Sequence, residues 1–294
     1  MRVLVTAATA PYLYHLAPLA WALRTAGHEV RAAVPDGVVE AARGSGLAAV
    51  GTGGGQDIGP LVRAAREWPA ELVVWDQHSV GGGIAARVAG AAHVRVLSGA
   101  HQAPGTAGTA RLADLAGAHG VACTDDLVFG ELTVDPLVDG VGGDRGARRV
   151  AVRPVPYDGP AAVPAFLQKK ARRPRVLVTG RALADIGELD AEVVAVVDSA
   201  RLPAGTRMPR HVRLLEPMPV HGLLSFCSAV VHDGDPLIQA AAAVRGVPQQ
   251  TTGERVDRLL DDPAVRAEAE RVRAELAERP SPGGLVPRLE GLVR

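Results

Sequence analysis

The sequence predicts an α/β protein with two domains, each a parallel sheet covered by helices on both faces. Short apolar runs alternate with stretches of helical length, which is the pattern of βαβ units. The alternation stops in a stretch rich in Gly, Pro and Arg, residues 140–173, and then starts again. At 294 residues the chain is long enough for two hydrophobic cores. We therefore expect two Rossmann-like domains joined by a linker at residues 151–174.

Buried strands are expected in the first half wherever apolar residues follow one another, at residues 2–6, 30–34, 47–50, 72–76 and 94–97. A loop at residues 7–11 precedes a helix with Leu16, Leu19 and Leu23 on one face, which ends at Gly27. Further helices are expected at residues 38–43, 58–66 and 84–89. This order of elements favours one parallel sheet with helical crossovers.

The second half repeats the alternation. Strands are expected at residues 176–179, 193–197, 212–215 and 229–232. An Ala-rich helix after the last of these ends at residues 246–248, Gly-Val-Pro. Two more helices, at residues 263–279 and 284–293, complete the chain.

Composition excludes several classes of function. Acidic and basic residues balance at 32 each, so no nucleic-acid partner is indicated. No apolar run is long enough to cross a membrane, and the chain starts with a strand rather than a signal peptide. Cys123 and Cys227 lie far apart, which fits a reduced cytoplasm, and no Cys/His spacing indicates a metal site. We expect a cytoplasmic protein without a metal or cofactor.

The chain is organised around residues 229–239, which predict a strand, a tight turn and the start of a helix. Such a turn aims backbone N–H groups and a positive helix end at one point, where a phosphate normally binds. We expect His232, Gly234 and Asp235 to form this turn. Asp235 and Leu237 would hinder a pyrophosphate by charge and by bulk.

The same stretch resembles the sugar-nucleotide loop of antibiotic glycosyltransferases of the GT-B fold, which reads V-H-H-G-G-x-G-T and later G-V-P-Q. His232, Gly234 and residues 246–249 match at the same spacing, whereas Asp235, Leu237 and Ile238 replace Gly, Gly and Thr. Further likeness is found in residues 18–24, 72–76, 155–160 and 259–263. The resemblance is to transferases that attach deoxysugars to anthracyclines, other aromatic polyketides and macrolides, several of which work with a cytochrome-P450-like helper protein.

The resemblance implies two Rossmann-like domains that face each other across a cleft. Residues 1–150 would be the acceptor-type domain and residues 175–280 the degenerate nucleotide-sugar domain. Residues 281–294 would be a C-terminal helix that returns to the first domain.

The resemblance also implies a general base on the first loop, held by an Asp. The base position falls on Tyr12, a poor base at neutral pH, and His15 follows nearly one helical turn later. Asp76 matches the supporting Asp, His78 lies beside it, and His101 follows the strand at residues 94–97. Each of these residues also has an ordinary structural interpretation. Asp76 would cap the following turn, His15 would be a partly exposed residue at the helix start, Tyr12 would line the cleft without chemistry, and the other histidines would be solvated loop side chains.

Two segments are expected to be shorter than in the resembled family. Residues 103–121 stand where acceptor-covering helices would be, and residues 249–253 run straight into the next helix without the strand and the Asp-Gln pair that hold the sugar. A fold tolerates the loss of a surface loop, whereas the loss of substrate contacts indicates a change in function.

Three functions remain open at this point. The first is acid–base chemistry, such as cyclisation, dehydration or rearrangement, on a polyketide-like small molecule in the interdomain cleft. The second is active transfer of a deoxysugar from a nucleotide diphosphate sugar, the donor substrate, to an aglycone. The third is a non-catalytic role as the partner of a true transferase or helper protein, and a homodimer is a further possibility. A fold alone does not decide between them.

Overall fold

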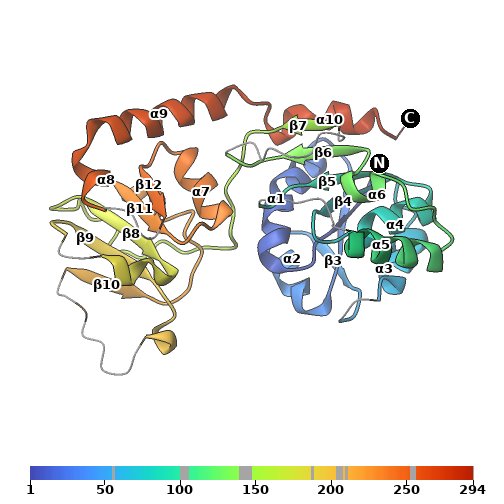
Figure 1. Cartoon of the computed structure of the whole chain (residues 1–294), viewed down its shortest axis with the longest axis horizontal. Coiled ribbons are helices and arrows are strands. Elements are labelled where there is room, and N and C mark those ends of the chain that lie inside the picture. Colours follow the sequence, from blue (N-terminus) through green and yellow to red (C-terminus); the bar gives the residue numbers. More distant parts are fainter. Residues whose placement is uncertain are drawn as a thin grey trace. The chain divides into compact units, whose positions relative to one another are not determined.

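The structure, a computed structural model, describes residues 1–54, 57–99, 106–138, 148–186, 189–202, 208, 211–251 and 256–293. The chain divides into two compact units (Figure 1). Unit 1 contains Met1–Arg153 and Arg279–Arg294, and unit 2 contains Pro154–Glu278. Each unit has its own sheet and its own core, so each is an α/β fold in itself.

The sheet of unit 1 has seven parallel strands. In spatial order they are β3 (Ala48–Gly51), β2 (Glu29–Val34), β1 (Arg2–Thr6), β4 (Leu72–Asp76), β5 (Ala92–Val96), β6 (Leu132–Asp135) and β7 (Arg149–Ala151). The chain order reverses direction between the central strands β1 and β4. Loops that follow two such strands leave the sheet in opposite directions and open a crevice, where ligands of open α/β sheets bind.

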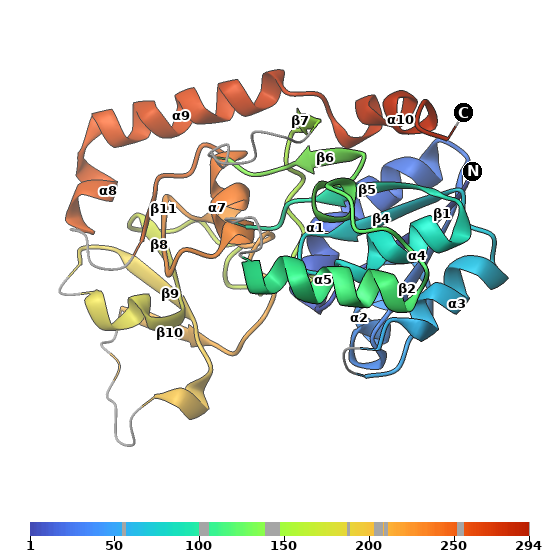
Figure 2. The ribbon, with the colours of Figure 1, turned by 45° about the vertical axis from the view of Figure 1, so that its right-hand side comes forward.

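Helices cover both faces of this sheet (Figures 1 and 2). One face carries α1 (Ala10–Thr25), α2 (Val39–Gly44) and α10 (Pro282–Glu290). The other carries α3 (Gly59–Glu67) and α4 (Gly81–Ala89), and α5 (Thr106–Ala118) and α6 (Asp126–Phe129) pack against α4. The terminal helix α10 contributes Leu285 and Leu289 to the same core as α1.

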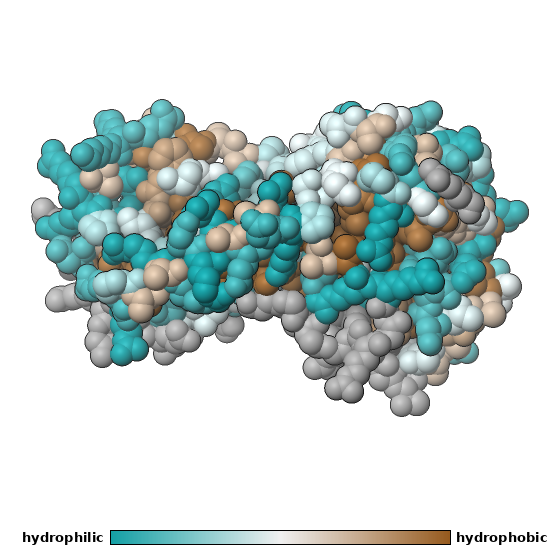
Figure 3. Space-filling view, turned by 90° about the horizontal axis from the view of Figure 1, so that it is seen from above, coloured by the Kyte–Doolittle hydropathy of each residue, from teal (hydrophilic) through white to brown (hydrophobic). Residues whose placement is uncertain are grey.

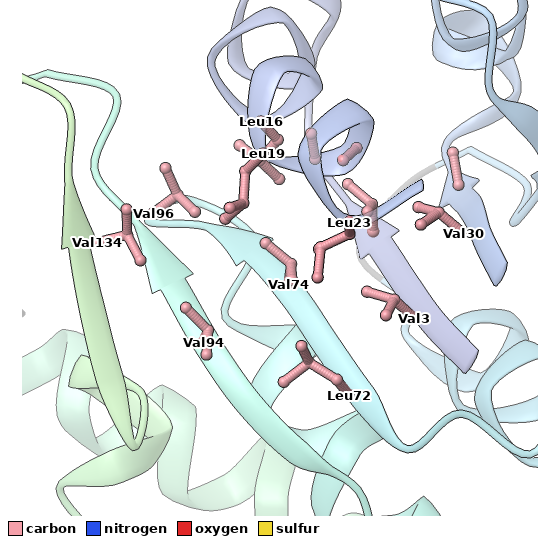
Figure 4. Close-up of a cluster of buried hydrophobic side chains, with 14 of the residues drawn as sticks. Val3, Leu16, Leu19, Leu23, Val30, Leu72, Val74, Val94, Val96 and Val134 are labelled. Carbon is pink, nitrogen blue, oxygen red and sulfur yellow. The ribbon is translucent and has the colours of Figure 1, made fainter. Parts of the chain in front are cut away.

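The main core of unit 1 lies between α1 and the strands. Figure 4 shows Leu16, Leu19 and Leu23 of α1 pointing at valines of the sheet, among them Val3 and Val74. These side chains are almost fully buried. Burying one such side chain is worth roughly 1.5–3 kcal/mol. The helical spacing of the leucines therefore fixes how α1 lies on β1 and β4, and so where the loop between β1 and α1 is placed.

Unit 2 repeats the plan with five parallel strands. In spatial order they are β10 (Val212–Leu215), β9 (Glu192–Val196), β8 (Arg175–Thr179), β11 (Ala229–His232) and β12 (Gln249–Thr251). Its order reverses between β8 and β11. The helix α7 (Pro236–Ala243) packs on one face and α8 (Asp257–Asp261) on the other, and α9 (Pro263–Glu278) follows α8.

Several elements differ from the sequence-based expectation. The expectation that residues 249–253 contain no strand is wrong, because Gln249–Thr251 forms β12 and pairs with β11. Strands β6 and β7 and helices α5, α6 and α8 were not anticipated. The polar triplet Gln-Gln-Thr has no apolar alternation, so its extended form comes from hydrogen bonds to its neighbour strand rather than from a local pattern.

A substitution at Gly82 tests the close packing of α4 on the sheet. A Cβ there would lie 2.5 Å from Trp75 Cβ and 3.1 Å from Thr6 Cγ2. We expect Gly82→Ala to lower the free energy of unfolding by about 1–3 kcal/mol, because the core has no room for it. Gly117→Ala in α5 is the matched control, since nothing lies within 4 Å of its added Cβ. Urea unfolding should show the control unchanged or more stable; equal destabilisation of both variants would contradict this packing.

Candidate functional site

A cavity of about 360 Å³ opens at the carboxyl ends of the strands of unit 1. The turns after β1 and β4 supply its central wall, so it lies at the point where the strand order reverses. Its lining includes Ala8, His78, Ser79, Asp57 and Arg111. Apolar side chains of α3 and α5 complete the wall. The arrangement suits a mainly apolar ligand with a few polar groups.

Asp76 ties together the two turns that frame this cavity. It ends β4 and is fully buried. Its carboxylate accepts hydrogen bonds from the backbone N–H groups of Ala8, at 3.0 Å, and His78, at 2.8 Å, and from the hydroxyl of Ser79. Burial raises the pKa of Asp76, and these three hydrogen bonds oppose the rise. Asp76 therefore fixes the backbone on both sides of the strand reversal.

Tyr12 and His78 are brought together by the fold. Their rings stack with centroids 4.3 Å apart and planes inclined by 20°. Tyr12 comes from the first turn of α1 and His78 from the turn after β4, and of the two only His78 lines the cavity. Stacking of this kind holds an imidazole ring in one plane.

Gln77 settles which nitrogen of His78 carries the proton. Its side-chain oxygen accepts from the backbone N–H of Ser98 at 3.2 Å, so its amide NH₂ faces His78 Nε2 at 3.2 Å. Nε2 must then accept, and the neutral ring is protonated on Nδ1. Nδ1–H is therefore the donor group that the ring retains, on a side chain that lines the cavity.

His15 lies on α1, and the structure gives it a different environment from His78. Burial lowers its pKa to about 4, so the ring is neutral at pH 7. Among the described residues no hydrogen bond joins it to Asp76, and it does not line the cavity. Its assignment as a base stays a prediction. His101 lies outside the described residues.

Asp57 and Arg111 are cavity residues that the sequence analysis missed. The carboxylate of Asp57 accepts from the backbone N–H of Gly59 at 2.8 Å, at the start of α3. Arg111 comes from α5, which the sequence did not clearly predict. No local pattern marks either residue, because only the packing of α3 and α5 on α4 brings them to the cavity.

The strand reversal in unit 2 carries His232 and Gly234. His232 is almost fully buried; its Nδ1 accepts from Gly234 N at 3.2 Å, and its Nε2 lies 3.1 Å from Gln249 Oε1. Burial lowers the pKa of His232, so the ring is neutral and holds the turn to β12. Gly234 has a φ of +88°, a conformation that glycine adopts without strain.

Asp235 occupies the amino end of α7 with its own carboxylate. One oxygen accepts from the backbone N–H of Leu237 at 2.8 Å and of Ile238 at 3.4 Å, which is an N-cap. Asp233 adds a second carboxylate across the reversal, since a Cβ on Gly180 would meet its Oδ2. The N–H groups that would bind a phosphate are thus already paired with a carboxylate. No cluster of three or more metal-binding side chains occurs in the described part of the chain.

Comparison with known proteins identifies the family. Models of the N-terminal and C-terminal domains of erythromycin biosynthesis protein CIII-like proteins match residues 55–181 and 180–259. Tylactone mycaminosyltransferase of Streptomyces fradiae is 30% identical over 100% of this chain and 92% of its own length. The chain belongs to this family of polyketide glycosyltransferases. 10-Deoxymethynolide desosaminyltransferase of Streptomyces venezuelae is 29% identical and is covered over 97% of its length.

Solved structures of the polyketide glycosyltransferases confirm the fold. Spinosyn forosaminyltransferase SpnP matches with a TM-score of 0.90 and 30% identity, over 100% of this chain and 99% of its own. The glycosyltransferase VinC in complex with dTDP matches with a TM-score of 0.86 and 28% identity, over 100% and 99%. Both are GT-B glycosyltransferases, as the sequence resemblance implied.

This member of the polyketide glycosyltransferases is short. Its alignment with tylactone mycaminosyltransferase spans 418 positions, whereas the chain has 294 residues. The alignment covers 92% of the relative and all of this chain, so many of the residues that this chain lacks lie inside the aligned region. None of the helices in the described part of the chain is both long and apolar enough for a membrane span.

The pKa of His15 gives a pH-dependent stability. Because the folded value is about 4 and the ordinary value is 6.5, the unfolded chain binds a proton between these pH values and the folded chain does not. His15 therefore costs nothing above pH 6.5 and destabilises progressively as the pH falls toward 4. The free energy of unfolding falls as the pH is lowered, and we expect His15→Gln to reduce this fall by about 1–3 kcal/mol. Urea unfolding of the unaltered protein and of His15→Gln at pH 7.5 and 4.5 measures this difference. An identical fall in the free energy of unfolding in the two proteins would show that His15 titrates normally.

Proposed function

We propose that this protein binds a polyketide-like small molecule in the cavity of unit 1 and acts on it by acid–base chemistry, such as cyclisation, dehydration or rearrangement. Unit 1 would be the acceptor-type domain and unit 2 a degenerate nucleotide-sugar domain, and we place the protein in the cytoplasm. The observation that carries this proposal is the Asp235 cap on α7, which opposes the binding of a sugar donor.

Charge and steric bulk at the turn that contains Asp235 support this proposal. A helix amino end carries the equivalent of about half a positive charge, which one anion neutralises. Asp235 is that anion, and a pyrophosphate beside it would meet like charge. Leu237 adds a side chain where close approach of a phosphate favours glycine. Both features weaken a sugar nucleotide without unfolding the turn.

The acceptor side supplies groups for chemistry. His78 Nδ1–H would hold and polarise a carbonyl or hydroxyl oxygen of the bound molecule, as a neutral imidazole does elsewhere. Tyr12 keeps the ring in plane and Asp76 keeps its turn in place, so both position His78. Neutral His15 is able to accept a proton at pH 7, although its low pKa makes it a weak base.

Active sugar transfer is the second candidate, and the comparisons favour it. The relatives are named as transferases of mycaminose and desosamine, and VinC was solved with dTDP. His232 and Gly234 still form the turn whose sequence resembles the sugar-nucleotide loop of the family. In this candidate a nucleotide diphosphate sugar is the donor, and the binding of dTDP separates it from the first.

Restoring the donor turn provides the decisive binding experiment. We expect the unaltered protein to bind dTDP or UDP at best in the millimolar range. Replacing Asp235 and Leu237 together by Gly should tighten the binding at least about 10-fold, since it removes a like charge and a bulky group. Calorimetric titration measures both, and Asp262→Gly, which removes an N-terminal carboxylate of α9, is the control. Micromolar binding by the unaltered protein would overturn the first candidate in favour of sugar transfer.

Turnover of the small molecule tests the residues. With a polyketide aglycone panel followed by mass spectrometry, His78→Ala should reduce turnover by roughly 100-fold, the size of a general acid–base contribution. An equal loss in His15→Ala would support His15 as the base, although it does not line the cavity. Tyr12→Phe keeps the stacked ring and is the matched control, expected to remain within about 3-fold. Full activity in both histidine variants would remove the proposed site. Co-purification of a transferase without any turnover would replace catalysis with an auxiliary role.

A further inference from the structure

A second cavity, of about 830 Å³, lies within unit 2 at the opposite end of its sheet from His232 and Asp235. Its lining includes Pro174, Ser228 and Pro248, which directly precede β8, β11 and β12. The cavity is therefore at the amino ends of the strands, on the side of the sheet away from any donor substrate. Helix α9 forms its other wall, and we call it the α9 cavity.

The wall formed by α9 is charged. Arg266, Glu270 and Arg273 are four and three residues apart, so they lie on one face of the helix, and all three line the cavity. A surface helix normally turns an apolar stripe toward its domain. Along α9, which is described throughout, Leu276 is the one buried side chain. Figure 3 looks onto the face that carries α9, where hydrophilic side chains cover much of the surface.

Arg245 faces α9 from the end of α7. Its Nη1 donates to the carbonyl of Ala241 at 3.0 Å. The structure gives no carboxylate ion pair to this guanidinium among the residues it describes. Burial lowers the pKa of Arg245, with a smaller opposing effect of Asp158, yet arginine stays charged in proteins. A half-buried cation that lacks a close anion gains most from an anionic ligand.

The remaining charges leave the cavity positive. Arg273 donates through Nε, at 2.8 Å, and Nη2 to the carboxylate of Glu270, so these two charges cancel. Arg266 uses one nitrogen on the carbonyl of Leu260, at 2.7 Å, and keeps its charge. Arg245 and Arg266 therefore carry an excess of two positive charges, which matches a phosphate dianion. The planar fork of guanidinium is suited to phosphate oxygens.

Gly246 has no side chain, so the ion pair between Glu270 and Arg273 of α9 is able to lie close to its backbone. Its φ is +64°, and a Cβ there would lie 2.9 Å from Glu270 Oε2 and 3.1 Å from Arg273 Cδ. The thiol of Cys227 also lines the cavity, and burial raises its pKa to about 12, so it remains an uncharged thiol. The charge of the cavity is thus set by its arginines and Glu270.

We propose that the α9 cavity binds a phosphate group, held by Arg245 and Arg266 with the hydroxyl group of Ser228 as a further donor. The phosphate comes either as the free ion or as part of a phosphorylated small molecule. The site is separate from the acceptor cavity of unit 1 and from the turn that contains Asp235, so it does not depend on the proposed reaction.

Titration with inorganic phosphate at fixed ionic strength tests the site, followed by phosphorus NMR or calorimetry. We expect saturable binding by the unaltered protein, and at least about 10-fold weaker binding in Arg245→Gln and in Arg266→Gln. Arg271→Gln is the matched control, because Arg271 lies on the same helix but pairs with Glu268 at 2.8 Å and with Glu275. Its binding should stay within about 2-fold.

Further probes separate the sources of the phosphate. Tighter binding of a phosphate monoester such as glucose 1-phosphate than of inorganic phosphate would assign the cavity to a phosphorylated metabolite, and the reverse order would assign it to the free ion. Acetate should bind at least about 10-fold more weakly than either. Circular dichroism and the Tm confirm that each variant is folded. No saturation with phosphate, or equal weakening by Arg271→Gln, would overturn the proposal.

Discussion

The buried carboxylate of Asp76 is the constraint on which the first unit depends. Parallel strands end with backbone N–H groups that need partners, and the two turns after β1 and β4 diverge at this point. Asp76 satisfies both turns with one side chain, through Ala8 on one side and His78 and Ser79 on the other. The cavity, the plane of His78 and its stacking on Tyr12 all follow from that arrangement. The family resemblance matched Asp76 to the Asp that holds a catalytic base. In this structure its hydrogen bonds shape the two turns.

The point where the strand order reverses differs between the two units. In unit 1 the strand reversal opens into a lined cavity. In unit 2 it carries carboxylates, with Asp235 on the amino end of α7 and Asp233 beside Gly180. A helix amino end attracts either a bound anion or a capping carboxylate, and the chain itself provides the latter. Both units therefore keep the parallel-sheet scaffold of the family, and the amino end of α7 in unit 2 is capped by a carboxylate of the chain itself.

The sequence predicted those features that depend on local pattern. Apolar runs located β1, β4 and β11 correctly, because buried parallel strands need them. Strand β12 is polar and exists through its pairing with β11, so no local pattern revealed it. The site follows the same division. His78 was identified as a candidate from its place after a strand, but its stacking on Tyr12 and its tautomer depend on contacts between distant segments.

The Asp235 cap links stability and donor binding at one residue. In a turn built for phosphate, the first N–H groups of the helix stay unpaired until the ligand binds, which lowers the stability of the unliganded protein. A capping Asp supplies about 0.5–2 kcal/mol in the absence of any ligand. It also places a negative charge where the ligand would add two more. One hydrogen-bonded carboxylate therefore accounts for both the stability of the unliganded helix start and the weak pyrophosphate binding that we propose. Under the proposed function, this cap stabilises unit 2 without a nucleotide sugar, and the cavity of unit 1 serves another reaction.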